Sequence, residues 1–282
     1  MIFKMIRKMI RSPKTLLSPV TPTALRLMGR QALAIARRIL QELWRRKRSL
    51  VFWSLFPALV LVLNGLILAE RAQLPIAAAF ERAAPVSWVG AALFFSCLGG
   101  TVATLVGERE SGTFRRLGLS PLGGMAYFLG ISLAHGAIAL GQAVIVGIIA
   151  TAVGAQFQGA WWLGGAIGLL SVLAYVGVGF VLGGQFARRT EDVNALVAAL
   201  GVPLLILGGS FVPAWLFPPL LQQLARFDPI YHMNEALLRV ASEGATAADI
   251  ALHLWVLGGV AIGGLGLSAV TYQQLLRRDR CL

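Results

Sequence analysis

The chain has 282 residues, of which 57% are hydrophobic and only 13% are charged, and its mean hydropathy is +0.75. A soluble domain carries about 25% charged residues, so this composition excludes an ordinary soluble domain and indicates a membrane protein. The net charge of +13 does not indicate nucleic-acid binding, because the cations are not interleaved with stacking aromatic residues in a soluble module.

The N-terminal segment is strongly basic and contains 13 of the 25 Lys and Arg residues, all before residue 49. Three prolines among residues 1–22 predict a flexible cytoplasmic tail. In residues 23–48 apolar residues recur at helical spacing, with most arginines elsewhere on the helical wheel. We expect this amphipathic helix to lie in the inner membrane interface; packing on a partner protein is the alternative. The first long apolar run begins near Leu50, too late for a signal peptide.

Six uncharged apolar runs are long enough to cross the hydrocarbon core. With the N-terminus inside, the cytoplasmic segments hold 21 Lys and Arg residues and the outer segments hold 4, so both termini are predicted to be cytoplasmic. The sequence therefore predicts an all-α membrane protein with a membrane domain at 49–276 and a cytoplasmic tail at 277–282. The six runs are 50–69, 85–107, a part of 117–161 centred near Leu140, 161–187, 195–225 and 250–276.

The cytoplasmic stretch 107–120, GERESGTFRRLGLS, lies between the second and third spans. Its acids precede its arginines, which is the order that complements a helix dipole, and Phe114 and Leu117 give it one apolar face. A solvated turn is the alternative. We interpret the stretch as a short interfacial helix with an apolar knob and a charged rim, which is typical of a docking element.

The fifth run is predicted to be a span followed by a re-entrant segment on the outer side. Pro213 and Pro218 follow a Gly208–Ser210 break, and proline removes helical hydrogen bonds. Irregular backbone at this depth needs protein or water to satisfy it. We also considered whether the whole run forms a plain span, but the prolines favour the broken form.

A short amphipathic helix is predicted next on the outer side. Asp228-Pro229 is an N-cap followed by proline at the first helical position, and Gly244 is a plausible end. The helix and the re-entrant segment together form an expected outer cap between the fifth and sixth spans. The candidate cap or gate residues are Pro213, Pro218, Asp228, Pro229 and Tyr231.

The loop resembles the signature E-R-E-x-G-T-x-x-R-L that follows the second span in the type-two permease family of ABC transporters. The family also has a Gly-rich end to its fifth span, a Pro-rich outer segment and an Asn-Pro-x-x-Tyr-like helix start. In this chain Asp228 replaces the Asn, and Tyr231 comes one position early. The resemblance covers about residues 25–276. The signature matches are Glu108, Arg109, Glu110, Gly112, Thr113, Arg116 and Leu117.

The resemblance implies a function as well as a fold. Residues 49–276 would be the permease domain of an ATP-driven exporter that forms a homodimer and binds two separate ATPase subunits. The loop at 107–120, with Phe114 as its knob, would be the coupling helix. ATP and Mg would bind the partner ATPase, which agrees with the absence of a GxxxxGK[ST] motif here. This chain would be a non-catalytic, multi-pass protein of the bacterial inner membrane without a bound cofactor.

Polar residues inside the spans give a second candidate site. His135 and Gln142 are seven residues apart and therefore share one face of the third span. Polar groups in a membrane face a cavity or a neighbouring helix. We expect this face to border the substrate path; helix–helix hydrogen bonding is the alternative. The three histidines and two cysteines do not form a metal-binding pattern.

Three other functions remain as alternatives. A secondary transporter or channel without an ATPase partner would show inverted repeats and charge inside its spans, and the sequence shows neither. An intramembrane enzyme would need a Ser/His pair, paired acids or a metal set in the bilayer, and no such set is evident. A membrane scaffold that does not transport is the third. The residues do not identify the substrate.

Overall fold

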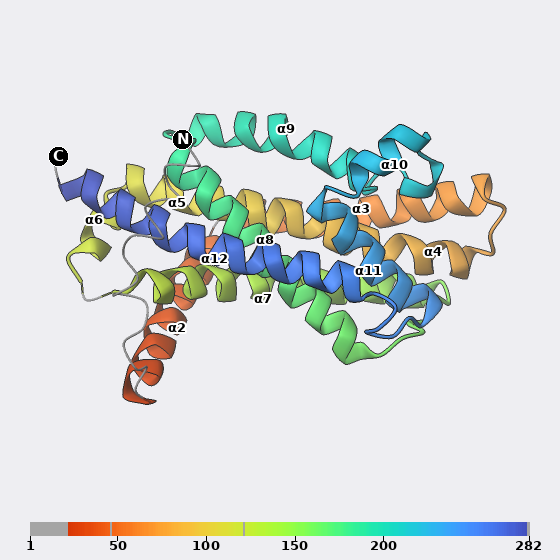
Figure 1. Cartoon of the computed structure of the whole chain (residues 1–282), viewed down its shortest axis with the longest axis horizontal. Coiled ribbons are helices and arrows are strands. Elements are labelled where there is room, and N and C mark those ends of the chain that lie inside the picture. The colour runs from red at the N-terminus through yellow and green to blue at the C-terminus, as the bar shows by residue number, and fades with distance from the viewer. Residues whose placement is uncertain (1–21, 46, 121, 281–282) are drawn as a thin grey trace.

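The structure is a computed structural model that describes residues 22–45, 47–120 and 122–280, and every regular element in those ranges is a helix (Figure 1). Six helical stretches are long and apolar enough to cross a membrane, which confirms the predicted all-α fold with six spans. They are Leu50–Arg71 in α3 (Lys47–Arg71), the stretch Ile76–Glu110, α7 (Gly124–Ala152), α8 (Trp161–Gln185), α9 (Thr190–Leu207) and Ala251–Arg277 in α12 (Ala251–Arg280). The predicted tail at 1–22 falls outside the described residues except for its last position.

The helix predicted at 23–48 is α2 (Pro22–Arg45), and α3 begins at Lys47. In Figure 1, α2 runs steeply across the long axis of the bundle. The placement of this helix in the membrane interface stays a prediction, but the middle of its apolar stripe packs on the chain itself. Ala32, Ile35 and Ile39 are buried, and Ile35 lies so close to Gly130 of α7 that no side chain would fit there. The chain itself therefore covers the stripe, while Leu33 and Trp44 remain exposed.

The second span is one continuous helical stretch from Ile76 to Glu110 that lies among the other helices. It consists of α4 (Ile76–Pro85), the two π-helical segments η2 (Val86–Ala92) and η3 (Phe94–Gly99), and α5 (Gly100–Glu110). Proline removes one i→i−4 hydrogen bond, and Pro85 stands where the α-helical part gives way to π-helix. This span contributes most to the core, from Ala79 to Val106.

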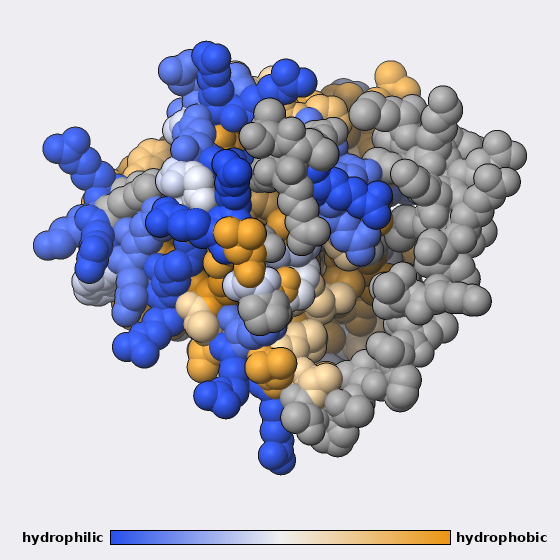
Figure 2. All heavy atoms as spheres, turned by 90° about the vertical axis from the view of Figure 1, so that its left-hand side faces the viewer, coloured by the Kyte–Doolittle hydropathy of each residue, from blue (hydrophilic) through white to orange (hydrophobic). Residues whose placement is uncertain are grey.

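The two ends of the bundle differ in character. In Figure 1, α6 (Thr113–Gly118) and the end of α12 lie at one end, whereas α4, α10 (Pro219–Ala225) and α11 (Pro229–Glu243) lie at the other. Figure 2 shows the first end face-on, with hydrophilic side chains gathered over it. The chain therefore crosses the bundle an even number of times between α6 and the end of α12, in agreement with the four candidate spans in α7, α8, α9 and α12.

The fifth span ends earlier than the apolar run does. α9 stops at Leu207, and Gly209 takes a positive φ of 81° in the break that follows. A short 3₁₀ turn, η4 (Ala214–Leu216), and α10 then complete the run in place of a longer span. The predicted broken form is thus observed. α11 has the predicted ends, since Asp228 is its N-cap and Gly244 is its left-handed C-cap.

Close backbone packing joins α8 to α12. A Cβ atom built on Gly177 would lie 2.8 Å from the Cα of Gly264, so the two helices meet without an intervening side chain. Small residues allow such contacts between membrane helices and are the usual way in which they pack tightly.

We therefore expect Gly177→Leu to separate these helices and to lower the free energy of unfolding by about 1–3 kcal/mol, the usual cost of overpacking. The midpoint of thermal unfolding in detergent measures the effect. Gly259→Leu is the matched control, because nothing lies within 4 Å of a Cβ at Gly259 in α12. Equal midpoints for the two variants would contradict the packing described here.

Candidate functional site

The loop between the second and third spans consists of a left-handed turn and a short helix. Gly112 has a φ of 67°, a conformation that favours glycine, and it separates α5 from α6. The hydroxyl of Ser111 donates to that of Thr113 over 3.0 Å, and Arg116 donates to the Thr113 hydroxyl over 3.4 Å. Local hydrogen bonds therefore fix the direction in which α6 leaves the bundle.

Phe114 is not the exposed knob that the sequence led us to expect. Its side chain is fully buried and forms edge-to-face contacts with Tyr127 of α7 and Tyr272 of α12, at ring-centroid distances of 5.7 and 5.6 Å. Phe114 thus anchors α6 to two spans. The large apolar side chain that the loop does expose is Leu119, with 85% of its surface accessible. Arg116 is also exposed, and Leu117 is half-buried.

The three charged residues Glu108, Arg109 and Glu110 each bind a different helix. The buried carboxylate of Glu108 pairs with Arg38 of α2 and accepts a hydrogen bond of 2.6 Å from the hydroxyl of Tyr127. A buried carboxylate is tolerated where a counter-charge and hydrogen bonds satisfy it. The sequence alone did not identify Arg38, because it is one of several arginines on the same helix.

Arg109 and Glu110 extend the same arrangement to two further spans. Arg109 donates to the backbone carbonyls of Gly183 and Ala187 at the end of α8, over 3.4 and 3.1 Å. A cation suits that place, since unpaired carbonyls give the end of a helix a partial negative charge. Glu110 accepts hydrogen bonds from the backbone amide and the hydroxyl of Thr190, the first residue of α9.

We expect Arg38→Ala to lower the free energy of unfolding by about 3 kcal/mol, because it leaves the buried Glu108 carboxylate without its counter-charge. Adding Glu108→Gln should restore part of the loss, since the amide oxygen still accepts from Tyr127. Unfolding in detergent measures both. The control is Arg37→Ala, because Arg37 is exposed on the same turn of α2. A double variant less stable than Arg38→Ala would argue against the pair.

His135 and Gln142 are buried between helices. The amide of Gln142 donates to the backbone carbonyl of Trp53 in α3 over 2.8 Å, and its oxygen accepts from Ser96 in η3 over 2.9 Å. Gln142 thus forms hydrogen bonds between helices, which is the alternative that the sequence left open. His135 is fully buried beside Trp53 and Gly100, and its ring nitrogens have no partner among the described residues. Their place on a substrate path stays a prediction.

The segment after α9 is connected to α11 by Asn234, which the sequence did not indicate. The amide of the buried Asn234 donates to the carbonyl of Gly208 over 2.9 Å and to the hydroxyl of Ser210 over 3.0 Å. Asn64 of α3 also donates to the carbonyl of Ser210, over 3.3 Å. Side chains from two helices thereby satisfy the backbone at the break after α9. No hydropathy pattern reveals such contacts, because they join residues that are distant in the chain.

Asp228 is a buried helix cap. One carboxylate oxygen accepts from the backbone amide of Ile230 over 2.9 Å, and the other has no partner in the described part of the chain. Burial raises the pKa of this carboxyl from 3.8 to about 6. Because the folded state holds the proton more tightly, the associated stability is present below pH 3.8 and is lost as the pH rises through about 6.

Asp228→Asn should therefore raise the free energy of unfolding at pH 8 by about 1–3 kcal/mol and leave it nearly unchanged at pH 4. The amide oxygen keeps the cap without a buried charge. Asp228→Ala should be less stable than Asp228→Asn at both pH values, because it loses a cap worth about 1 kcal/mol. Unfolding in detergent at the two pH values measures these differences. A gain that is equal at pH 4 and pH 8 would refute the assignment.

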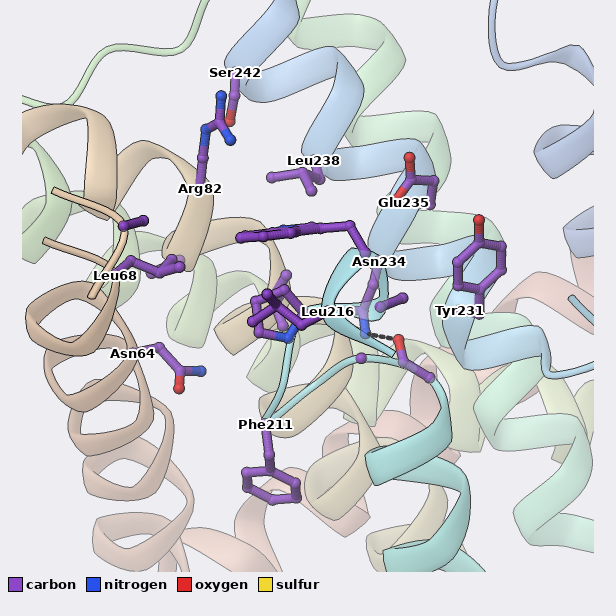
Figure 3. A pocket seen from close by; sticks show the side chains of 18 of the residues that line it. Asn64, Leu68, Arg82, Phe211, Leu216, Tyr231, Asn234, Glu235, Leu238 and Ser242 are labelled. Atoms are coloured by element: carbon purple, nitrogen blue, oxygen red, sulfur yellow. Dashed lines mark hydrogen bonds between the residues drawn. The ribbon is translucent and has the colours of Figure 1, made fainter. Parts of the chain in front are cut away.

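A pocket of about 500 Å³ lies at the same end of the bundle as α11. Side chains from α3, α4, the segment after α9 and α11 form its walls (Figure 3). Two of the predicted cap residues, Pro213 and Tyr231, line it. Pro218 is exposed and immediately precedes α10 in the chain, and Pro229 is the first residue of α11. In the described residues, no group of three or more His, Cys, Asp or Glu side chains could hold a metal ion.

Six candidate spans, a short loop helix anchored to α7 and α12, and an interrupted segment after α9 are the architecture of a multi-pass membrane protein. The sequence pattern of the ABC-2 type transporter family matches residues 30–241, which is well over half of the chain. The chain therefore belongs to the ABC-2 type transporter family, whose membrane domains are non-catalytic, and it is a multi-pass membrane protein.

Individual relatives are more distant. The chain is similar to the inner membrane transport permease YadH of Escherichia coli K12, with 32% identity over 95 residues, and equally to YadH of Shigella flexneri. The matched stretch covers 33% of this chain and 37% of the relative. The chain thus matches little more than a third of the length of these relatives.

Proposed function

We propose that the chain is the membrane-spanning subunit of an ATP-driven exporter and that it is coupled to separate ATPase subunits through the loop at 107–120. The family assignment supports the general role. The name of the YadH relatives, inner membrane transport permeases, supports placement in a bacterial inner membrane. In this proposal both termini are cytoplasmic, α2 lies along the inner interface, and the segment after α9 together with α11 forms the outer cap.

The observation that carries the proposal is the set of contacts made by Glu108, Arg109 and Glu110. These neighbours bind α2, the end of α8 and the start of α9. A force applied to the loop would therefore reach three other helices directly, through charge-assisted hydrogen bonds, which are among the stronger ones in proteins. A loop that only kept a turn soluble would not need partners on three helices.

The exposed side chains of the loop form the proposed docking surface, namely Arg115, Arg116, Leu119 and Ser120. Leu119 is the apolar member that enters the partner, and the two arginines form its charged rim. Phe114 is buried beneath this surface and holds α6 against α7 and α12. An apolar anchor surrounded by polar residues is the usual arrangement at a protein–protein contact.

In this proposal the permease is a homodimer, because its ATPase partner works as a pair. ATPases of this kind bind ATP and Mg between two subunits, so two permease loops are required for one ATPase pair. Two chains would then enclose the substrate path, with closure of the ATPase pair moving both loops together.

We expect Leu119→Asp to abolish co-purification of the permease with the ATPase encoded next to it, while the unfolding midpoint of the permease stays unchanged. The matched control is Phe227→Asp, because Phe227 is 86% exposed and lies between α10 and α11, which are at the other end of the bundle. Phe114→Ala should instead lower the free energy of unfolding by about 3–5 kcal/mol, since it empties a buried site. Retention of the ATPase by the Leu119→Asp variant would exclude this docking surface.

A further inference from the structure

Three arginines surround the pocket at the outer end of the bundle. Arg71 ends α3, Arg82 belongs to α4, and Arg226 follows α10, and all three line the pocket with exposed side chains. None of them forms an ion pair with a described residue. Guanidinium groups bind phosphate and carboxylate through paired hydrogen bonds, so three unpaired ones around one pocket favour an acidic group.

One carboxylate on the other side of the pocket is also without an ion-pair partner. Glu235 of α11 is half-buried and makes no ion pair in the part of the chain that the structure describes. In Figure 3 it lies across the pocket from Arg82. The second acid in the lining, Glu243, differs because it pairs with Arg239 over 3.7 Å. Burial raises the pKa of Glu235, and the charge of Arg239 on the same helix lowers it only in part. A cation bound beside the carboxyl would offset the remaining cost of burial.

The remaining wall of the pocket is apolar. It is formed by Leu68 of α3, Leu238 of α11 and the exposed side chains of Trp215 and Leu216 from the outer segment. Small-molecule sites commonly combine such a wall with a few polar groups that fix orientation. Here the polar groups are of both charges, and Arg82 and Glu235 lie across the pocket from each other.

We propose that this pocket binds a zwitterionic amphiphile with a phosphate and a primary ammonium group. The phosphate lies among Arg71, Arg82 and Arg226, the ammonium pairs with Glu235, and the hydrocarbon chain lies along the apolar wall. Two sources share this chemistry, a lipid of the outer leaflet and an exported molecule. Binding can be measured on the permease alone, so the proposal does not rest on the proposed coupling to an ATPase.

The test is native mass spectrometry of the full-length protein in dodecyl maltoside, with lyso-phosphatidylethanolamine as the probe. Lyso-phosphatidylglycerol of the same chain length is the probe that lacks the ammonium. We expect one saturable lyso-phosphatidylethanolamine per chain and weaker binding of lyso-phosphatidylglycerol. The double variant Arg82→Gln/Arg226→Gln should bind both probes at least about tenfold more weakly, as expected for loss of charge-assisted hydrogen bonds.

Glu235→Gln should bind both probes with nearly equal affinity, because it removes the group that recognises the ammonium. Ala72→Phe adds bulk to the lining without changing its charge and should weaken the binding of both probes. It therefore shows the effect of blocking the pocket separately from the effect of removing a charge. The control is Arg188→Gln, since Arg188 is exposed near the opposite end of the bundle. Elution volume and unfolding midpoint verify that each variant is folded.

Two results would overturn the proposal. One is equal binding of the two probes by the unaltered chain, and the other is full binding by the folded arginine variant. The purified protein also distinguishes the sources. A zwitterionic lipid that co-purifies with the unaltered chain and is lost from the arginine variant identifies the membrane as the source. If no lipid co-purifies with the unaltered chain but the added probe still binds, the natural ligand is an exported molecule.

Discussion

The buried carboxylate of Glu108 is the constraint on which the end of the bundle that carries α6 depends. It requires a counter-charge and a hydrogen-bond donor, and these come from Arg38 of α2 and Tyr127 of α7. Satisfying one charge therefore fixes three elements, and the rings around Tyr127 attach α6 and α12 to the same point. The loop is held in place from inside the bundle, and its outward face is left free for contact.

Much of the fold follows from the sequence because it depends on local properties. Six long uncharged runs favour helices in lipid, because about 20 apolar residues suit a helix that satisfies its own backbone groups, whereas a spanning strand needs only about 10. Asp228 and Gly244 mark the ends of α11 through their own conformational preferences. The charged loop at 107–120 was recognisable because it is short, polar and ordered in sign.

The contacts of the candidate sites could not be predicted in the same way, because they join residues that are far apart in the chain. Helical periodicity places Phe114 on an apolar face. It does not show whether that face meets solvent or packs on Tyr272, which comes 158 positions later in the chain. Gln142 and Asn234 are hydrogen-bonded to other helices whose distance is set by packing alone. The apolar stripe of α2 likewise predicts burial but does not say which surface covers it.

The continuity of the second span has a consequence for both ends of the molecule. One unbroken helical stretch carries Arg82, which lines the pocket near α11, and Glu108, which is 26 residues further along. At about 1.5 Å per residue the two lie about 40 Å apart. A ligand and an ATPase that each displaced this stretch would be thermodynamically linked. Whatever factor docking applied to ligand affinity, the ligand would apply to docking, because such coupling is reciprocal.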